Sequence, residues 1–421
     1  MEAATDPPRR RRRRQRKEVQ SHTSTTTISE LPSQIISDII SRLPLKSIFS
    51  CKRVCSSFRN QTLDPHFPQL QLPRSPLCLI LYRPSNSARP TYFQFLPLDD
   101  SLVDLRSRRA RIGFATQIDI AAVSRLNILN SCNGLICLAN YLFTENVYVC
   151  NPVTRQHFRL PESKEKPSVM DEEPQPLFFW YGLGYSRSAD LFKVVKFTLS
   201  LENVMSESFC SIYTLGVDDE WRNLGNAGLK LPLNLPHNRR FVFLNGALHW
   251  IGWENSMMLL YYFDMEKELC GNLPLPSQFD RHGFHLGVVD DCLYISDELT
   301  SSVSVNIWVM KDYGNIGSWT LEWIIKRPLP SGLGWDLKPI KTLEDGTVLM
   351  IVGKKTLASY NPVSKVLEKI CNLGLPVQNG FETFRLILLK EYQGMVNSGV
   401  GLEPSQENDD FWKAFKSIKV S

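Results

Sequence analysis

The sequence of 421 residues lacks several features that would mark particular classes of protein. None of its ten cysteines belongs to a pair with the C-x-x-C spacing of a zinc site. No apolar run approaches the roughly 20 residues that cross a bilayer, and no apolar signal core follows the basic residues near the start. We therefore expect an intracellular protein, located in the nucleus, the cytoplasm or both, whose thiols are reduced.

Acidic residues are absent from one strongly basic segment near the amino end. Residues 1–27 are rich in Pro, Arg, Ser and Thr and have little to bury, so we expect a disordered arm. The arm is a candidate nuclear import signal or a solvated tail, and no aromatic residues are interleaved to stack on bases. Its basic residues are Arg9, Arg10, Arg11, Arg12, Arg13, Arg14, Arg16 and Lys17.

The most patterned stretch is residues 28–67, where apolar residues recur at helical spacing. Pro32 suits the first position of a helix, and Pro44 ends the apolar run that follows it. Two further short apolar faces come after Pro44, so the pattern predicts three short helices. A unit of about forty residues rarely buries such a stripe alone, and we therefore expect its leftover apolar surface to bind a partner.

This stretch closely resembles the F-box. The residues that carry the resemblance are Leu31-Pro32, Ile35-Ile36, Ile39-Ile40, Arg42-Leu43-Pro44-Leu45-Lys46-Ser47, Lys52-Arg53-Val54-Cys55 and Asp64-Pro65-His66-Phe67. The resemblance implies docking on a Skp-type adaptor and, through it, on a cullin within a ubiquitin ligase. The residues expected to contact the adaptor are Leu31, Pro32, Ile35, Ile39, Leu43, Pro44, Leu45, Ile48 and Val54.

From Leu77 onward, short runs rich in β-branched and aromatic residues alternate with turn residues, as in all-β domains. Asn133-Gly134, Asn245-Gly246 and Asp345-Gly346 are dipeptides typical of tight hairpins. Each is followed by two strands separated by a loop, and the chain then leaves on another strand. Two successive hairpins form a four-stranded antiparallel unit, which is the blade of a propeller. We expect six or seven blades, with strands at 77–98 and 384–389 among them.

The β-rich region resembles the F-box-associated, kelch-like domain of plant F-box proteins. The matching residues are Ser131-Cys132-Asn133-Gly134-Leu135-Ile136-Cys137, Asn151-Pro152-Val153-Thr154-Arg155, Leu160-Pro161, Gly182-Leu183-Gly184-Tyr185, Leu244-Asn245-Gly246-Ala247-Leu248-His249-Trp250 and Phe263-Asp264. We therefore expect an α+β multidomain chain with a basic arm (1–27), an F-box (28–67), a linker (68–76), a propeller (77–390) and a tail (391–421).

Residues with the spacing of a catalytic or metal site are scarce. His282 and His285 have no third ligand at a recognisable spacing, and packing is the expected role of His249. We therefore expect a non-catalytic adaptor subunit without a cofactor, whose propeller binds a target protein that the sequence does not identify. The alternatives are a nuclear regulator that binds nucleic acid through its arm and an F-box protein that acts outside a ligase.

Overall fold

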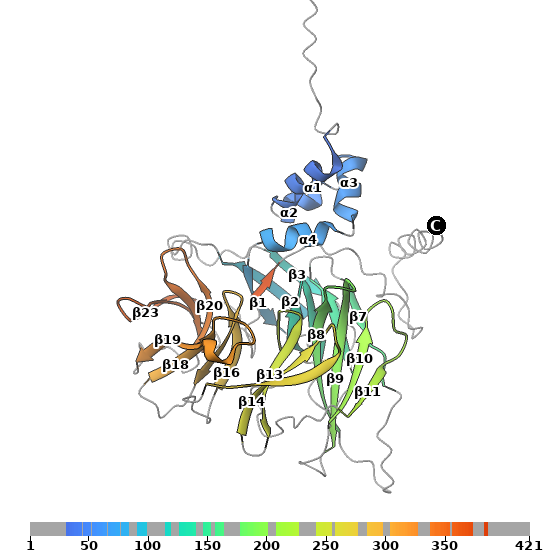
Figure 1. Ribbon diagram of the computed structural model, residues 1–421. Coiled ribbons are helices and arrows are strands. Elements are labelled where there is room, and N and C mark those ends of the chain that lie inside the picture. Colours follow the sequence, from blue (N-terminus) through green and yellow to red (C-terminus); the bar gives the residue numbers. More distant parts are fainter. Residues whose placement is uncertain are drawn as a thin grey trace, which may run out of the picture.

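The computed structural model describes a small helical unit and a larger β domain (Figure 1). The described residues are 31–43, 45–51, 53–64, 66–75, 77–83, 91–98, 114–118, 126–139, 146–152, 156–163, 177–200, 208–226, 241–254, 257–276, 284–297, 304–326, 337–353, 356–373 and 383–385. The predicted arm and tail lie outside these ranges.

Four α-helices and a short 3₁₀ turn form the helical unit: α1(Ser33–Ser41), α2(Leu45–Cys51), α3(Ser56–Leu63), α4(Phe67–Gln71) and η2(Leu72–Arg74). Pro32 precedes α1 as its N-cap residue rather than occupying the first helical position, and its carbonyl accepts from the N–H groups of Ile35 (3.0 Å) and Ile36 (3.2 Å). Most of α4 and all of η2 fall in residues 68–76, which we expected to be a linker.

The β strands form six antiparallel sheets of four strands each among the described residues. Five sheets are made of consecutive strands, so each is one contiguous blade: β4(Asn127–Cys132) to β7(Gln156–Arg159), β8(Leu177–Ser186) to β11(Arg222–Asn226), β12(Val242–Leu244) to β15(Leu269–Pro274), β16(Phe284–Val289) to β19(Trp319–Lys326), and β20(Leu337–Thr342) to β23(Val366–Asn372). The strands inside these blades are β5(Leu135–Ala139), β6(Val147–Asn151), β9(Leu191–Ser200), β10(Phe209–Thr214), β13(Ala247–Glu254), β14(Met257–Asp264), β17(Cys292–Asp297), β18(Ser304–Met310), β21(Val348–Val352) and β22(Thr356–Asn361), and a 3₁₀ turn, η3(Ile316–Ser318), precedes β19.

The remaining sheet joins the two ends of the β domain. Strands β1(Leu77–Arg83), β2(Thr91–Pro97) and β3(Phe114–Ile118) pair in order, and β24(Thr383–Arg385) pairs with β1. This pairing brings residues about 300 positions apart in the sequence into one composite sheet. In place of the expected six or seven blades, the structure therefore has five contiguous blades and one sheet assembled from both ends of the domain.

Apolar residues between neighbouring sheets form the core of the propeller. Strands β1 and β2 share one cluster with β4 and β5, which includes Ile80, Phe93 and Ile136, and on their other face they share a second cluster with β20–β22, which includes Leu79 and Ile351. Four more clusters join the contiguous blades to one another in chain order. The domain is thus held together by burial between sheets, the largest favourable contribution to folding.

Tight turns connect the first two strands of several blades. Asn133 (φ 40°) and Gly134 (φ 89°) form the two-residue loop between β4 and β5, and Asn245-Gly246 forms the matching loop between β12 and β13. Both loops confirm the turns predicted from these two dipeptides. Asp345-Gly346 instead lies in the longer connection 343–347 between β20 and β21, where Gly346 has a positive φ (78°) and Asp345 does not. A third loop, Asp290-Asp291, also has a positive φ at both residues (48° and 58°); its sequence lacks glycine, which is why the prediction missed it.

Candidate partner-binding surface

The apolar stripe of α1 has two edges with different surroundings. Residues of an α-helix are about 100° apart around its axis, so Ile36 and Ile40 lie on one edge of the stripe and Ile35 and Ile39 on the other. Ile36 and Ile40 are 2% and 1% exposed, whereas Ile35 and Ile39 are 47% and 39% exposed. One edge is therefore covered within the chain and the other edge faces solvent.

The covered edge faces the other helices and belongs to a core cluster that continues into the propeller. Ile36, Ile40, Ile48 and Phe67 belong to the same core cluster as side chains of β1, β2, β4, β5 and β6. Inside the helical unit, the hydroxyl of Ser37 donates to Gln61 Oε1 at 2.6 Å and ties α1 to α3. The core of the small helical unit thus continues into the core of the β domain, which adds to the little that a unit of this size could bury alone.

Charged groups tie the carboxyl half of α1 to η2. Asp38 pairs with Arg42 (Oδ2 to Nε, 3.0 Å) and with Arg74 of η2 (Oδ1 to Nη2, 2.6 Å). Hydrogen bonds from these two guanidinium groups lower the pKa of Asp38 below its ordinary value. Arg74 also donates to the hydroxyl of Ser41, so the last turn of α1 is held against the chain segment that enters the propeller.

Helix α4 and η2 rest on the propeller at the hairpin between β8 and β9. Gln69 Nε2 donates to Asp190 Oδ1 at 3.3 Å, and the hydroxyl of Tyr185 donates to the same carboxylate oxygen. Leu72 packs against the cluster shared by blades β4–β7 and β8–β11. The contacts of Gln69, Leu72 and Phe67 fix how the helical unit sits on the β domain.

The nine residues predicted to contact a partner have different environments. Pro32, Ile35, Ile39 and Val54 are exposed, and Leu31 and Leu43 are half-buried and pack against the core cluster below them. Ile48 corrects the prediction: its side chain is fully buried in that cluster, so its role in this structure is packing. Leu45 begins α2, and Pro44 and the basic residues 9–17 lie outside the described residues.

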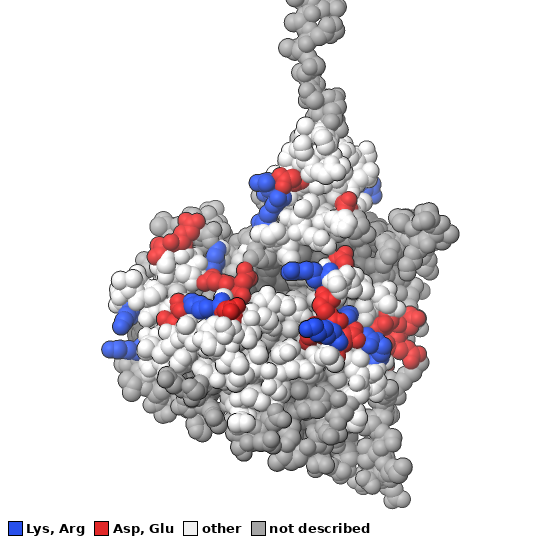
Figure 2. All heavy atoms as spheres, viewed as in Figure 1, with Lys and Arg blue, Asp and Glu red and all other residues white. Residues whose placement is uncertain are grey.

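Two exposed apolar side chains of the helical unit were not among the predicted contacts. Leu63 ends α3 and Leu70 lies on α4, and both are exposed. On the face drawn in Figure 2, the middle of the helical unit is free of charged side chains, with acidic and basic side chains at its sides and others spread across the β domain below. Depletion of charge at the centre of a surface patch is typical of protein–protein interfaces.

Histidines of the β domain serve packing in the described structure. His249 is buried; its Nδ1–H donates to the carbonyl of Val242 (3.2 Å), so Nε2 accepts from the hydroxyl of Tyr313 (2.7 Å). Burial lowers the pKa of His249 to about 4, which keeps the ring neutral. His282 lies outside the described residues, and among those described no group of three His, Cys, Asp or Glu side chains is arranged to hold a metal ion.

The cysteines all lie within the described ranges, and each is a free thiol. Burial raises the pKa of Cys270 to about 12 and also raises the pKa values of Cys150 and Cys210. Thiols with raised pKa values are poor nucleophiles, so these three are packing residues. In the part of the chain that the structure describes, no helix has both the length and the apolar content to cross a membrane.

The fold and the exposed helical surface define a class: a β-propeller that carries a small helical docking unit. The F-box domain matches residues 28–70, and the F-box associated beta propeller domain matches residues 102–333, which is more than half of the chain. The chain belongs to the family of plant F-box proteins with an F-box associated β-propeller domain.

Curated relatives from Arabidopsis thaliana match most of the chain. "F-box protein At3g07870" is 27% identical over 396 residues, covering 85% of this chain and 90% of the relative. "F-box protein At5g49610" is 25% identical over 366 residues, covering 84% and 96%. "F-box/kelch-repeat protein At3g23880" is 25% identical over 345 residues, covering 79% and 87%. The similarity spans both the helical unit and the propeller.

Proposed function

We propose that this protein is the substrate-recognition adaptor of an SCF-type (Skp–cullin–F-box) ubiquitin ligase. Its helical unit binds a Skp-type adaptor and, through it, a cullin, and its propeller binds the target protein. Other subunits transfer ubiquitin from a thioester to a lysine of the target. This chain is non-catalytic and acts in the nucleus, the cytoplasm or both, holding the target near the thioester so that the reaction becomes effectively intramolecular.

The exposed edge of α1 is the observation that carries the proposal. Ile35 and Ile39 are large apolar side chains that face solvent one turn apart, with Pro32 at the start of the same helix. The opposite edge of the stripe is already covered within the chain, so the fold does not require Ile35 and Ile39 for its own core. Large apolar side chains that face solvent together mark protein–protein interaction sites.

The propeller supports the second half of the proposal by its architecture. Its blades form a rigid scaffold, and the connections at the ends of a rigid scaffold are where binding specificity concentrates. The helical unit is seated on this scaffold through α4 and η2. A target bound to the propeller is therefore held in a defined position relative to the docking surface.

Co-purification tests the proposal with full-length variants. Ile35→Asp together with Ile39→Asp places two charges at the centre of the proposed interface, and we expect loss of both the Skp-type adaptor and the cullin from the purified complex. Ile324→Asp is the matched control, because Ile324 is 46% exposed, close to the 47% of Ile35, but lies on β19 of the propeller. The control is expected to retain both partners. Unchanged recovery with the double variant would refute the proposal, and recovery of the adaptor without a cullin would place the protein outside a ligase.

A further inference from the structure

The turn between β8 and β9 touches three parts of the molecule. It runs from Ser186 to Asp190, and its residues from Arg187 to Asp190 are exposed. On one side, Asp190 accepts the hydrogen bond from Gln69 of α4. On the other side, the turn holds Glu266, which belongs to the turn between β14 and β15 of the next blade. The turn therefore connects the helical unit to two neighbouring blades.

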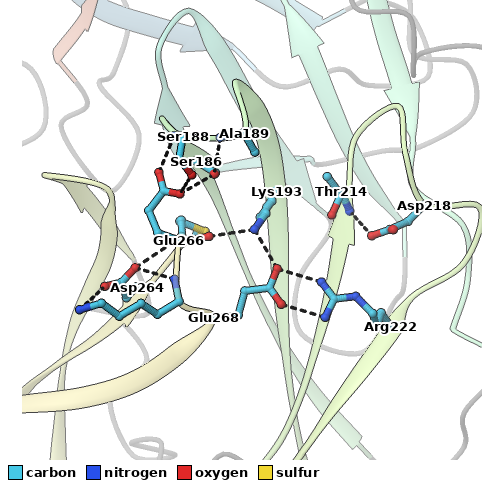
Figure 3. Close-up of polar contacts among 12 residues, drawn as sticks. Ser186, Ser188, Ala189, Lys193, Thr214, Asp218, Arg222, Asp264, Glu266 and Glu268 are labelled. Carbon is cyan, nitrogen blue, oxygen red and sulfur yellow. Dashed lines mark hydrogen bonds and ion pairs between the residues drawn. The ribbon is translucent and has the colours of Figure 1, made fainter.

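Serines of this turn hold Glu266 as a latch between the two blades (Figure 3). Glu266 Oε1 accepts from the backbone N–H of Ser188 at 2.9 Å. Glu266 Oε2 accepts from the hydroxyl of Ser186 at 2.9 Å and from the hydroxyl of Ser188. These donors lower the pKa of Glu266 to about 2, so the carboxylate that they hold is charged at neutral pH.

We propose that Ser188 is a phosphorylation site and that its phosphorylation opens the latch between blades β8–β11 and β12–β15. In this step a protein kinase transfers the γ-phosphoryl group of ATP to Ser188 Oγ. The new P–O bond replaces the bond between the γ-phosphorus and the β-phosphate oxygen, ADP leaves, and the hydroxyl proton passes to a base of the kinase. The hydroxyl donor to Glu266 becomes a phosphate ester with a charge near −2 at pH 7.

The charges around Ser188 favour opening of the latch. The phosphate occupies the position from which a hydroxyl donates to the Glu266 carboxylate, so two anions come within hydrogen-bond range and repel each other. Asp190, in the same turn, adds a third negative group. The neighbouring cations are Arg187, in the turn itself, Lys267, whose ammonium group lies 3.7 Å from a carboxylate oxygen of Asp264, and Lys193. The ammonium group of Lys193 donates to the carbonyl of Met265 at 2.9 Å and is paired with Glu268 at 2.8 Å.

Release of Glu266 has consequences on both sides of the turn. The turn between β14 and β15 loses the three hydrogen bonds of Glu266, while Lys193 and Arg222 of the neighbouring blade still hold Met265 and Glu268 of the same turn. The attachment of the helical unit to the propeller also weakens, because Asp190, which accepts a hydrogen bond from Gln69 of α4, lies in the turn that moves. Ile35 and Ile39, on the exposed edge of α1, take no part in these contacts. The switch therefore goes beyond the proposed function, since it changes how firmly the helical unit is seated without changing its partner-binding surface.

Hydrogen exchange measured by mass spectrometry on the full chain tests the switch. Phosphoserine installed at position 188 by genetic encoding is expected to speed amide exchange about tenfold over residues 264–268 and 67–71. Ser188→Ala is expected to speed exchange in the same segments less than about threefold, because alanine removes a donor without adding charge. Ser364 offers the matched control: it lies in the β22–β23 turn of another blade, and phosphoserine there should leave both segments unchanged. Unchanged or slower exchange with phosphoserine at 188 would overturn the switch.

Phosphopeptide mapping tests the site itself. Protein recovered from plant cells with phosphatases inhibited should carry phosphate on Ser188 in part of the molecules, and phosphatase treatment should remove it. Absence of phosphate from the peptide that contains Ser188 would overturn the assignment. Binding of the Skp-type adaptor should be the same for the phosphorylated and unmodified chains, so failure of the switch and failure of the proposed function give different results.

Discussion

Asn130 provides a sensitive test of how the blades are joined. It lies on β4, and its buried side chain reaches Leu183 on β8 of the next blade. Its Nδ2 donates to the carbonyl of Leu183 at 2.7 Å, and its Oδ1 accepts from the N–H of Leu183 at 2.8 Å. The side-chain amide thus pairs with both backbone groups of one residue, as a neighbouring strand does in a sheet.

Asn130→Ala should destabilise the propeller by about 4 kcal/mol. The substitution leaves the N–H and the carbonyl of Leu183 buried without their partner, and each unsatisfied group costs about 1–3 kcal/mol. Asn130→Asp should cost at least as much at neutral pH, because a carboxylate then faces the Leu183 carbonyl without a donor. Asn60→Ala is the control: Asn60 is exposed on α3, and its replacement should change the free energy of unfolding by less than about 0.5 kcal/mol.

Urea unfolding followed by circular dichroism measures these differences, and hydrogen exchange at the Leu183 amide locates them. The Asn130→Ala chain should also exchange that amide faster than the Asn60→Ala chain, because the amide has lost its acceptor. A change in the free energy of unfolding of less than about 1 kcal/mol for Asn130→Ala would refute the reasoning.

Three further predictions concern packing and pH. A Cβ at Gly184 would lie 2.2 Å from Cε of buried Met265, so Gly184→Ala should destabilise the chain by about 1–3 kcal/mol, with partial rescue by Met265→Ala; no rescue would refute this contact. Ile48→Ala should cost about 3 kcal/mol of stability in urea unfolding, because it opens a cavity in the core; a value below about 1 kcal/mol would show that Ile48 is not a core residue. Burial lowers the pKa of His249 to about 4. The contribution of the neutral ring to the free energy of unfolding, roughly 3 kcal/mol, is therefore complete above pH 6.5 and is lost as the pH falls towards 4. His249→Gln should remove that part of the pH dependence of the melting temperature, and an unchanged pH dependence would contradict this assignment.

Local signals in the sequence predicted much of the β domain. Asn133-Gly134 and Asn245-Gly246 form hairpin loops because both residues of each loop tolerate positive φ. Asp264 and Asn361 end the third strands of their blades and begin the turns that follow. Asp264 Oδ1 accepts from the N–H of Glu266 at 2.8 Å, and Asn361 Oδ1 accepts from the N–H of Val363 at 2.9 Å. These features depend on a few consecutive residues, so one sequence is enough to predict them.

Contacts between distant residues were beyond the reach of the same reasoning. Asn130 and Leu183 are 53 positions apart, and no periodicity links them. Strand β24 pairs with β1 across most of the chain, so counting repeats could not show that one sheet is assembled from both ends. The Glu266 latch likewise joins turns of separate blades.

The candidate site was predicted in outline but not in detail. Helical spacing placed Ile35, Ile36, Ile39 and Ile40 on one stripe, and in the structure one edge of that stripe is buried in the core and the other faces solvent. Periodicity alone cannot make this division, because it depends on which edge of the helix the rest of the chain covers. The same limit explains Ile48, which was expected at the partner interface and lies in the core.

The affinity of the full-length protein for a purified Skp-type adaptor tests the central claim most directly. Isothermal titration calorimetry should show that Ile35→Ala with Ile39→Ala weakens binding about a hundredfold, since each truncation of a buried interface side chain costs on the order of 1–2 kcal/mol. Ile324→Ala should change the affinity less than about twofold, because it lies on the propeller. Equal affinities for the wild type and the double variant would contradict the account.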